Sequence, residues 1–283
     1  MSSGTRAAGV IGWPVSHSLS PRLHGFWLRE HGIDGAYVVL PVQTTAFSAA
    51  LLGLRATGFA GVNVTVPHKQ AAFAIAHRCD DDARTAGAAN LLLFKGKEIE
   101  ARNTDIAGLQ ASLVAECGLD AVRVKQVVVL GAGGAARAAV LACDALKAAE
   151  IHILNRTERR AGALVRDLSG FTSAKLGAAG LDAWDDIAPA AALVIQATSA
   201  GMSGMSGHEL DFRLLPRDAA VCELVYRPLE TALLAQARGL GLRCIDGLGM
   251  LIHQGVPAFE ALYGIRPRVT AALRADLEQA LRE

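Results

Sequence analysis

Apolar and polar positions alternate in short blocks over the first hundred residues. Three apolar stretches, at residues 7–12, 36–42 and 61–66, have the length and composition of strands. Between the first two, residues 20–32 carry apolar side chains every three or four positions, which is typical of one face of a helix. The order strand, helix, strand, helix, strand predicts a mostly parallel sheet with helices on both sides.

A second alternation begins at about residue 107, where a helix runs to about residue 118. Apolar strands follow, with alanine-rich helices between the first few. The predicted strands cover residues 124–131, 150–155, 192–198, 219–226 and 242–246. Two helical segments, residues 247–264 and 266–283, end the chain, and the pattern alone does not assign them to either half. The fold class predicted is α/β.

Composition excludes several classes of protein. The 283 residues suffice for one large or two ordinary domains, and 28 Lys and Arg against 27 Asp and Glu leave no basic excess for nucleic acid. No apolar run approaches the ~18 residues of a membrane span, and no signal peptide is recognisable. The five cysteines form no C-x-x-C pair, which favours free thiols in a reducing cytoplasm. The eight histidines show no ligand spacing, so no metal site is predicted.

The clearest motif is VVVLGAGGAARAAVLAC, residues 127–143. It consists of a strand, the pattern G-x-G-x-x-A from Gly131 to Ala136, and a helix, which is the context that a dinucleotide fingerprint requires. The glycines permit a tight turn and close backbone approach, and the helix N-terminus offers N–H groups to a pyrophosphate. The alternative is a glycine turn that only packs the helix on the strand.

The end of the next strand predicts which dinucleotide is bound. NAD-binding units usually carry an acidic residue there, about 20 residues after the glycines, to bind the ribose 2′-hydroxyl. Here Asn155, Arg156 and Thr157 occupy that place, and Arg159 and Arg160 follow. The basic residues favour the extra phosphate of NADP. A solvated basic helix start is the alternative reading.

The stretch GVNVTVPHK, residues 61–69, leads from a strand through a proline to a lysine. Its valines face one side and Asn63 and Thr65 the other, because strand side chains alternate. Pro67 suits the first turn of a following helix. Thr65 and Lys69 are thereby brought to the carboxyl end of the strand, although a solvated surface position is the commoner fate of lysine.

Other polar residues cluster where elements begin. Ser18 and Ser20 lie at a loop-to-helix junction, and Ser20 before Pro21 is typical of a helix N-cap. Asp105 follows an Asn-Thr pair and is placed either to cap a helix or to act chemically. If these side chains converge with Lys69 at one cleft between the two halves, they form a site that binds hydroxyl groups and transfers a proton.

These motifs together resemble the shikimate dehydrogenase family, and the resemblance runs over nearly the whole chain. The motifs in family order are GWPVSHSLSPRLH, GVNVTVPHK, GAAN, NTD, GAGGAAR, NRT, ATSAGM, YRP with ETALL, and DGLGMLIHQG. The resemblance implies reversible NADPH-dependent reduction of 3-dehydroshikimate to shikimate, in the pathway to aromatic amino acids. It also implies a discontinuous α/β substrate domain, residues 1–106 completed by 246–283, and a Rossmann NADP-binding domain, residues 107–245.

The resemblance also implies roles for single residues. Lys69 and Asp105 would be the catalytic pair. The substrate would be bound by Ser18, Ser20, Thr65, Asn90, Asp105, Tyr226 and Gln254, with the two serines on its carboxylate. The cofactor would be bound by Gly131, Ala132, Gly133, Gly134, Ala135, Asn155, Arg156, Thr157, Arg160, Leu224 and Gly247. The partner implied is this small molecule, with neither nucleic acid nor membrane, and the chain would be a monomer or a homodimer.

Four residues of this chain differ from those that the family often has, and two other functions stay open. This chain has Gly25, Leu91, Ile106 and Glu223 where the family often has Asn, Thr, Gly and Asp. Relatives that oxidise quinate tend to have threonine where Ser20 stands, so Ser20 favours shikimate. The rivals are a quinate or quinate/shikimate dehydrogenase that uses NAD, and a non-catalytic ligand-binding relative. Retention of a proton-transfer pair argues against the non-catalytic relative.

Overall fold

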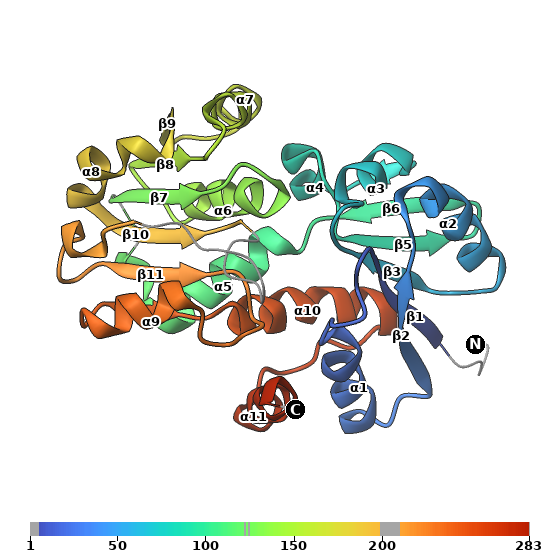
Figure 1. Cartoon of the computed structure of the whole chain (residues 1–283). Coiled ribbons are helices and arrows are strands. Elements are labelled where there is room, and N and C mark those ends of the chain that lie inside the picture. The colour runs from blue at the N-terminus through green and yellow to red at the C-terminus, as the bar shows by residue number, and fades with distance from the viewer. Residues whose placement is uncertain (1–5, 122, 124, 199–209, 283) are drawn as a thin grey trace. The chain divides into compact units, whose positions relative to one another are not determined.

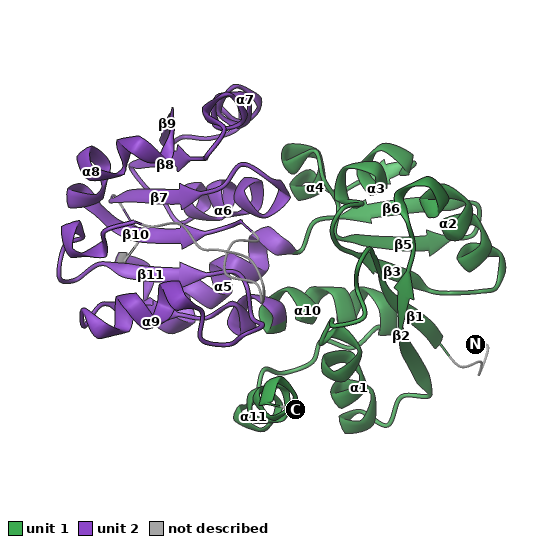
Figure 2. Cartoon of the chain, in the orientation of Figure 1, with its two compact units in different colours: residues 1–104, 252–283 green, residues 105–251 purple. Residues whose placement is uncertain are grey.

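The computed structural model describes residues 6–121, 123, 125–198 and 210–282. The chain forms two compact units (Figure 1). Unit 1 contains residues 1–104 and 252–283, and unit 2 contains residues 105–251 (Figure 2). Unit 1 is therefore discontinuous in sequence, and helix α10 (Gly247–Tyr263) runs across the boundary at residues 251 and 252.

Unit 1 contains a mixed six-stranded sheet in the order β2-β1-β3-β5-β6-β4. Its strands are β1 (Arg6–Gly12), β2 (Gly35–Pro41), β3 (Gly61–Val64), β4 (Arg78–Cys79), β5 (Leu91–Lys95) and β6 (Glu98–Arg102). β1 pairs in parallel with β2 and β3, as the alternating pattern predicts. The prediction of a mostly parallel sheet is confirmed, because β4 also pairs in parallel with β6, and of these six strands β5 alone runs the opposite way, antiparallel to both β3 and β6. A two-residue turn joins β5 to β6, and its Gly96 has a φ of 63°, which favours glycine.

Helices accompany this sheet. They are α1 (Ser20–Glu30), α2 (Phe47–Ala56), α3 (Lys69–Ile75), α4 (Asp81–Ala86) and α11 (Ala271–Arg282), with a 3₁₀ turn η1 (Thr44–Ala46). The prediction that Ser20 caps α1 is wrong, because the helix begins at Ser20 and its cap position, Leu19, has no side-chain bond. Pro67 likewise precedes α3 by two residues instead of lying in its first turn. β3 stops at Val64 because the next residues form a turn, in which the His68 N–H donates to the Thr65 carbonyl.

Unit 2 contains a wholly parallel six-stranded sheet in the order β9-β8-β7-β10-β11-β12. Its strands are β7 (Gln126–Leu130), β8 (Glu150–Leu154), β9 (Lys175–Ala179), β10 (Ala191–Gln196), β11 (Ala220–Glu223) and β12 (Arg243–Ile245). Its helices are α5 (Asp105–Cys117), α6 (Gly134–Ala145), α7 (Glu158–Leu168), α8 (Trp184–Ile187) and α9 (Ala232–Gly239), with 3₁₀ turns η2 (Leu119–Ala121), η3 (Leu181–Ala183), η4 (Ala188–Ala190) and η5 (Phe212–Leu214). This strand order is that of a Rossmann fold, so the predicted α/β class is confirmed.

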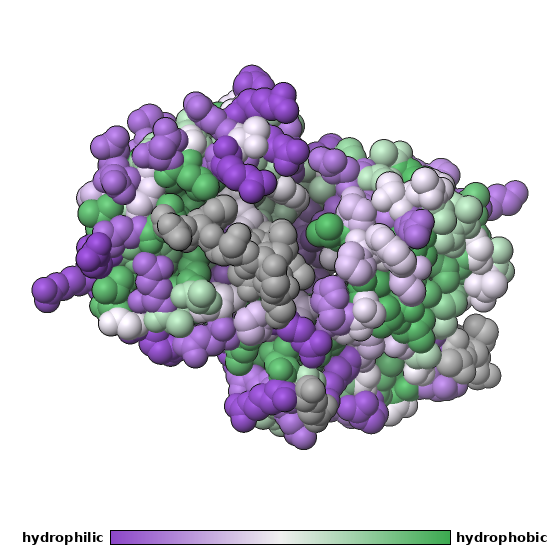
Figure 3. Space-filling model, in the orientation of Figure 1, coloured by the Kyte–Doolittle hydropathy of each residue, from purple (hydrophilic) through white to green (hydrophobic). Residues whose placement is uncertain are grey.

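The sequence pattern missed β9, whose residues KLGAA contain no β-branched side chain. Val124, where the first strand of this unit was predicted to begin, lies outside the described residues, as do residues 199–202 of the ATSAGM motif. Within the described part of the chain no helix is long and apolar enough to cross a membrane. Figure 3 shows apolar residues interspersed with hydrophilic ones on the face in view.

The C-terminal helices are held in unit 1 by aromatic packing around His24. Its ring stacks on Tyr37 at 4.0 Å between centroids, and Trp27 meets Phe259 of α10 edge-on at 5.4 Å. The Trp27 indole N–H also donates to the Arg268 carbonyl at 3.1 Å. His24 is fully buried, and neither of its ring nitrogens has a hydrogen-bond partner among the described residues.

Burial lowers the pKa of His24 from 6.5 to about 3, so the folded protein keeps this ring neutral while the unfolded chain takes up a proton. Because only the unfolded chain gains a proton on this ring in that range, the folded state loses stability as the pH falls from 6.5 towards 3. When the pH is lowered from 7.5 to 5, the free energy of unfolding of His24→Phe should therefore increase by about 2 kcal/mol relative to that of the parent. Urea unfolding at the two pH values measures this. An unchanged difference between variant and parent at the two pH values would contradict it.

Candidate active site

Three polar side chains from distant segments meet in unit 1. Asn90 lies before β5, Thr104 after β6, and Gln254 on α10. The Asn90 amide donates to the Thr104 hydroxyl at 2.9 Å and to Gln254 Oε1 at 3.3 Å, while its Oδ1 accepts the Thr104 N–H at 2.7 Å. Asn90 and Thr104 are buried. The structure therefore brings the predicted residues Asn90 and Gln254 together and adds Thr104, to which the sequence reading assigned no role.

A second layer supports this group. Asn63 of β3 donates to the Asn90 carbonyl at 3.2 Å and accepts the Tyr37 hydroxyl at 2.8 Å. Both Asn63 and Tyr37 are buried. The sequence reading noted that Asn63 faces away from the valines of its strand but gave it no part in the site. An amide inside an apolar strand was the available signal, because a buried amide requires hydrogen-bond partners.

Two serine hydroxyls lie side by side at the start of α1. Ser18 Oγ and Ser20 Oγ are 3.2 Å apart, and the Ser20 N–H is 3.2 Å from Ser18 Oγ. Ser20 is buried and Ser18 is half-buried. Paired hydroxyl donors beside a helix N-terminus suit a carboxylate, because the helix end also favours negative charge. The predicted pair is thus brought together.

Lys69 is the first residue of α3, and its backbone is tied to the polar group. Its carbonyl accepts the N–H of Ala89, the residue before Asn90, at 2.9 Å. His68 fixes the start of this helix, since its Nε2 lies 2.7 Å from the Val42 carbonyl and its ring stacks on Phe47. Thr65 is anchored by its own N–H, which donates to the Ile11 carbonyl at 2.9 Å. Lys69 and Thr65 are both half-buried.

Asp105 is the buried first residue of α5 and directly follows Thr104. Consecutive Cα atoms are about 3.8 Å apart, so the chain itself keeps Asp105 next to the hydroxyl that binds Asn90. A carboxylate in the first turn of a helix is favoured by the helix dipole. Local geometry therefore accounts for a buried acid at this position.

The glycine-rich turn of unit 2 joins β7 to α6, as the motif predicts. Gly131 has a φ of 115°, and a Cβ there would lie 2.8 Å from Thr198 Cγ2. Gly133 differs: its φ is −100°, and no atom lies within 4 Å of an added Cβ. No side chain caps α6. The fold itself requires Gly131, whereas the open space at Gly133 before an uncapped helix fits a pyrophosphate.

The turn after β8 lies beside the glycine turn, because β7 and β8 are parallel neighbours. The Asn155 amide donates to the Thr157 carbonyl at 2.9 Å and shapes this turn. Arg156, Arg160 and Glu158 are exposed. In the described part of the chain Arg156 forms no ion pair. An exposed guanidinium beside a dinucleotide turn fits the 2′-phosphate of NADP.

Leu224 and Gly247 are in direct contact. A Cβ at Gly247 would lie 2.5 Å from the Leu224 carbonyl oxygen, so only glycine permits this approach. The Leu224 N–H donates to the Gln196 carbonyl at 3.1 Å. β11 ends at Glu223 rather than at residue 226 as predicted, so Leu224 and half-buried Tyr226 lie in the turn after the strand. The two predicted nicotinamide residues are thus brought together.

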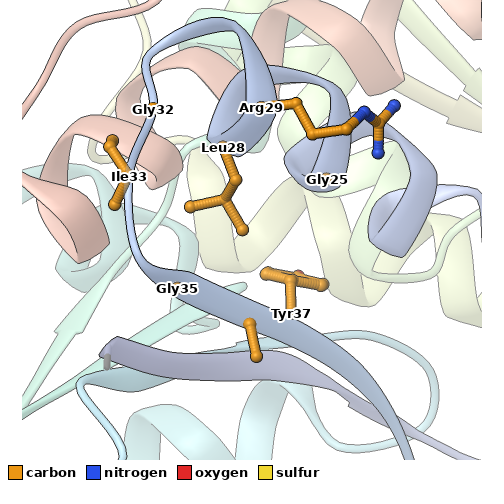
Figure 4. Close-up of a pocket in the computed structure, with 8 residues that line it drawn as sticks. Gly25, Leu28, Arg29, Gly32, Ile33, Gly35 and Tyr37 are labelled. Atoms are coloured by element: carbon orange, nitrogen blue, oxygen red, sulfur yellow. The ribbon is translucent and has the colours of Figure 1, made fainter. Parts of the chain in front are cut away.

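Two hollows, one in each unit, have linings that contain none of the predicted site residues. One of about 450 Å³ lies between the end of α1 and the start of β2 and is lined by Gly25, Leu28, Arg29 and Tyr37 among others (Figure 4). Another of about 620 Å³ is lined by residues including Asp211, Arg213 and Gln236. Among the described residues no cluster of His, Cys, Asp and Glu could hold a metal ion.

Comparison with known proteins gives two family matches. Residues 10–92 match the shikimate dehydrogenase substrate binding domain, and residues 114–209 match shikimate / quinate 5-dehydrogenase. Shikimate dehydrogenase (NADP(+)) of Mesorhizobium japonicum is 46% identical over 275 residues, which cover 97% of this chain and 96% of that protein. The protein of the same name from Acidiphilium cryptum is 47% identical, with 96% of each chain covered.

Solved structures agree in fold. Shikimate 5-dehydrogenase of Thermus thermophilus in complex with NADP(H) and shikimate has a TM-score of 0.83 and 33% identity, with 98% of this chain and 99% of that chain covered. Quinate dehydrogenase of Corynebacterium glutamicum in complex with NAD has a TM-score of 0.88 and 28% identity, with 97% and 99% covered. The fold is thus common to proteins that act on shikimate and on quinate.

The two glycines of the dinucleotide turn give a matched pair of substitutions. We expect Gly133→Ala to leave the melting temperature of the free protein almost unchanged but to weaken NADP binding about tenfold or more, because the methyl group would occupy the space of the pyrophosphate. Gly131→Ala should instead destabilise the free protein by about 1–3 kcal/mol, through its positive φ and the contact with Thr198. Calorimetric titration with NADP and thermal unfolding measure the two effects. Undiminished NADP affinity in Gly133→Ala would contradict the assignment.

Proposed function

The chain belongs to the shikimate dehydrogenase family, and from this we propose that it catalyses the reversible NADPH-dependent reduction of 3-dehydroshikimate to shikimate in aromatic amino acid biosynthesis. It is then an oxidoreductase that acts on a CH–OH group. The observation that carries the proposal is the group formed by Asn90, Thr104 and Gln254, because it presents amide and hydroxyl groups suited to a polyhydroxylated ring.

The substrate roles follow from the chemistry of each side chain. The Ser18 and Ser20 hydroxyls would donate to the carboxylate of shikimate. Asn90 and Gln254, with Thr65 and Tyr226, would bind the ring hydroxyls. Amides both donate and accept, so they can bind an alcohol or its ketone without changing their own protonation.

Lys69 and Asp105 would manage the proton at the reacting oxygen. NADPH supplies the hydride when it is bound. As the carbonyl carbon accepts that hydride, its oxygen gains an electron pair, and the Lys69 ammonium would donate the proton that completes the alcohol. In the reverse direction the neutral amine would accept the hydroxyl proton. Asp105 would hold the ammonium in place as its counterion.

The cofactor would lie along the carboxyl ends of the strands of unit 2. Gly131 to Ala135 would bind the pyrophosphate, while Asn155, Arg156, Thr157 and Arg160 would surround the 2′-phosphate of NADP. Leu224 and Gly247 would lie by the nicotinamide. Unit 2 would thus be the NADP-binding domain and unit 1 the substrate domain.

Two broader proposals accompany this one. All five cysteines are unpaired, which suits a reducing cytoplasm. The partner would be the small-molecule substrate, and the protein would act as a monomer or a homodimer. Neither proposal affects the roles of the residues above.

The experiment that tests the proposal follows formation of NADPH from NADP, and of NADH from NAD, by the purified protein with shikimate and, separately, with quinate. We propose that shikimate with NADP gives the highest kcat/KM. A higher kcat/KM for quinate with NAD would favour the rival function, to which the likeness to the Corynebacterium quinate dehydrogenase points. Absence of oxidation with either substrate would favour a non-catalytic relative.

Arg156 provides a test of cofactor choice. If it binds the 2′-phosphate, Arg156→Ala should weaken NADP binding by about 1.5–3 kcal/mol, the range for a hydrogen bond to a charged group, and leave NAD binding nearly unchanged. Arg166, an exposed residue in the last turn of α7, the helix that begins two residues after Arg156, offers a control in Arg166→Ala. Calorimetric titration with each dinucleotide measures the effect. Equal losses for NADP and NAD would reject the role.

Lys69 provides a test of the proton transfer. Lys69→Met keeps an unbranched side chain as far as the ε position and removes the ammonium, so kcat should fall by ~100-fold or more with little change in NADP affinity. Gln70→Met on the next, exposed residue is the control. Steady-state kinetics with shikimate and NADP measure both variants. A near-normal kcat with a raised KM would mean that Lys69 only binds the substrate.

A further inference from the structure

A buried carboxylate stands at the end of β11, outside the roles described so far. Glu223 is 0% exposed. Its Oε1 accepts the N–H of Val225 at 3.0 Å, and its Oε2 accepts the Thr231 hydroxyl at 3.2 Å. A single carboxylate therefore bonds to both ends of the turn formed by residues 224–231.

The far end of this turn is itself anchored. Thr231 is buried and caps α9, because its Oγ1 accepts the Leu234 N–H at 3.3 Å. Through Thr231, the Glu223 carboxylate connects the end of β11 to the start of α9. Between the two anchored ends lie Leu224, which contacts Gly247, and Tyr226.

The neighbouring strand ends in the same way. Gln196 of β10 pairs with Glu223 in register and is also buried. Its Oε1 accepts the N–H of Thr198, two residues on, at 3.0 Å, and the Thr198 hydroxyl at 2.8 Å. Thr198 in turn lies against Gly131 of the dinucleotide turn. Both strand ends thus use a buried side-chain oxygen to shape the turn that follows, but only Glu223 can change its charge.

The surroundings of Glu223 allow its carboxyl group to change its protonation state near neutral pH. Burial raises the pKa of Glu223 to about 7, against the lowering effect of hydrogen bonds from Val225, Thr231 and Leu224. Two other titratable groups belong to the same region of the sheet: the Cys222 thiol, on the same strand, and Asp246, directly after β12. The pKa of Cys222 is raised well above its usual value, first by burial and then by Glu223, while Asp246 acts on that thiol more weakly. Among the described residues no positive side chain compensates the carboxylate.

We propose that Glu223 is a positioning residue whose ionised carboxylate clamps the turn 224–231 and so holds Leu224 and Tyr226 for binding of cofactor and substrate. The inference rests on the proposed function. It assigns Glu223 no contact with either ligand. It also implies that the clamp opposes stability, since a buried charge without a positive partner destabilises the folded state relative to a neutral group.

The decisive variant is Glu223→Gln, which keeps the shape and one acceptor oxygen of the side chain but replaces the other oxygen with an NH2 donor and stays neutral. Glu230→Gln is the matched control, because Glu230 lies in the same turn but is exposed and pairs with Arg238 on the surface. Both variants and the parent are compared in thermal unfolding at pH 5 and pH 8.5. Their kcat/KM for shikimate with NADP is compared at pH 6 and pH 8.5.

We expect opposite effects on stability and on activity. Because the pKa of Glu223 is raised from 4.5 to about 7, the parent loses stability as the pH rises through this range. The difference in melting temperature between Glu223→Gln and the parent should therefore shift in favour of the variant by about 5 °C or more from pH 5 to pH 8.5. At pH 8.5 its kcat/KM should be lower than that of the parent by about fivefold or more, because charged acceptors form the stronger hydrogen bonds. At pH 6, where the parent carboxyl is also largely neutral, the two values should converge. Glu230→Gln should match the parent throughout.

Three results would overturn the inference. A Glu223→Gln variant that unfolds more easily at pH 8.5, or does not fold, would mean that the residue is merely structural. A kcat/KM ratio between variant and parent that is independent of pH, or is reproduced by Glu230→Gln, would reject the clamp while leaving the proposed function intact. A parent protein that oxidises no shikimate would instead reject the proposed function, and this inference with it.

Discussion

The proposed substrate site depends on the return of the C-terminal helices to unit 1. A Cβ at Gly255 would lie 2.7 Å from Leu23 Cδ2 and 3.2 Å from the Trp27 ring, so α10 packs closely on α1 at this glycine. The residue before it, Gln254, is then within 3.3 Å of Asn90. Apolar packing thereby brings one amide to a polar group whose other members come from the first 104 residues. Because core packing is dense, a shift of this helix would move Gln254 directly.

Buried polar groups within strands or at their ends recur in both units. Asn63 is buried in the short central strand of unit 1, and Gln196 and Glu223 end neighbouring strands of unit 2. Each accepts or donates hydrogen bonds that shape the backbone next to a predicted ligand group. Such groups are expensive to bury and are stable only when satisfied. Their concentration at these ends explains how a largely apolar sheet can support polar chemistry.

Features set by local sequence could be predicted, and features set by distant contacts could not. The alternating pattern identified β1 to β3 and the strand–glycine–helix turn, and the proximity of Ser18 to Ser20 follows from their spacing. The hairpin of β5 and β6 was missed because its glycine turn was not recognised, and β9 because its composition is not that of a strand. Gln254 lies 150 residues from Thr104, so no periodicity relates them. Resemblance to a family supplied that residue, and the fold supplied Thr104 and Asn63 beside it.

The central claim is that the polar group joined by Gln254 binds shikimate. Calorimetric titration of the protein with shikimate, without cofactor, tests it in the parent, in Gln254→Leu and in the exposed control Gln70→Leu. The claim predicts one shikimate per chain in the parent and control and at least about tenfold weaker binding in Gln254→Leu, since a hydroxyl would lose its partner in a buried site. Equal affinity in all three proteins, with Gln254→Leu still folded, would contradict it.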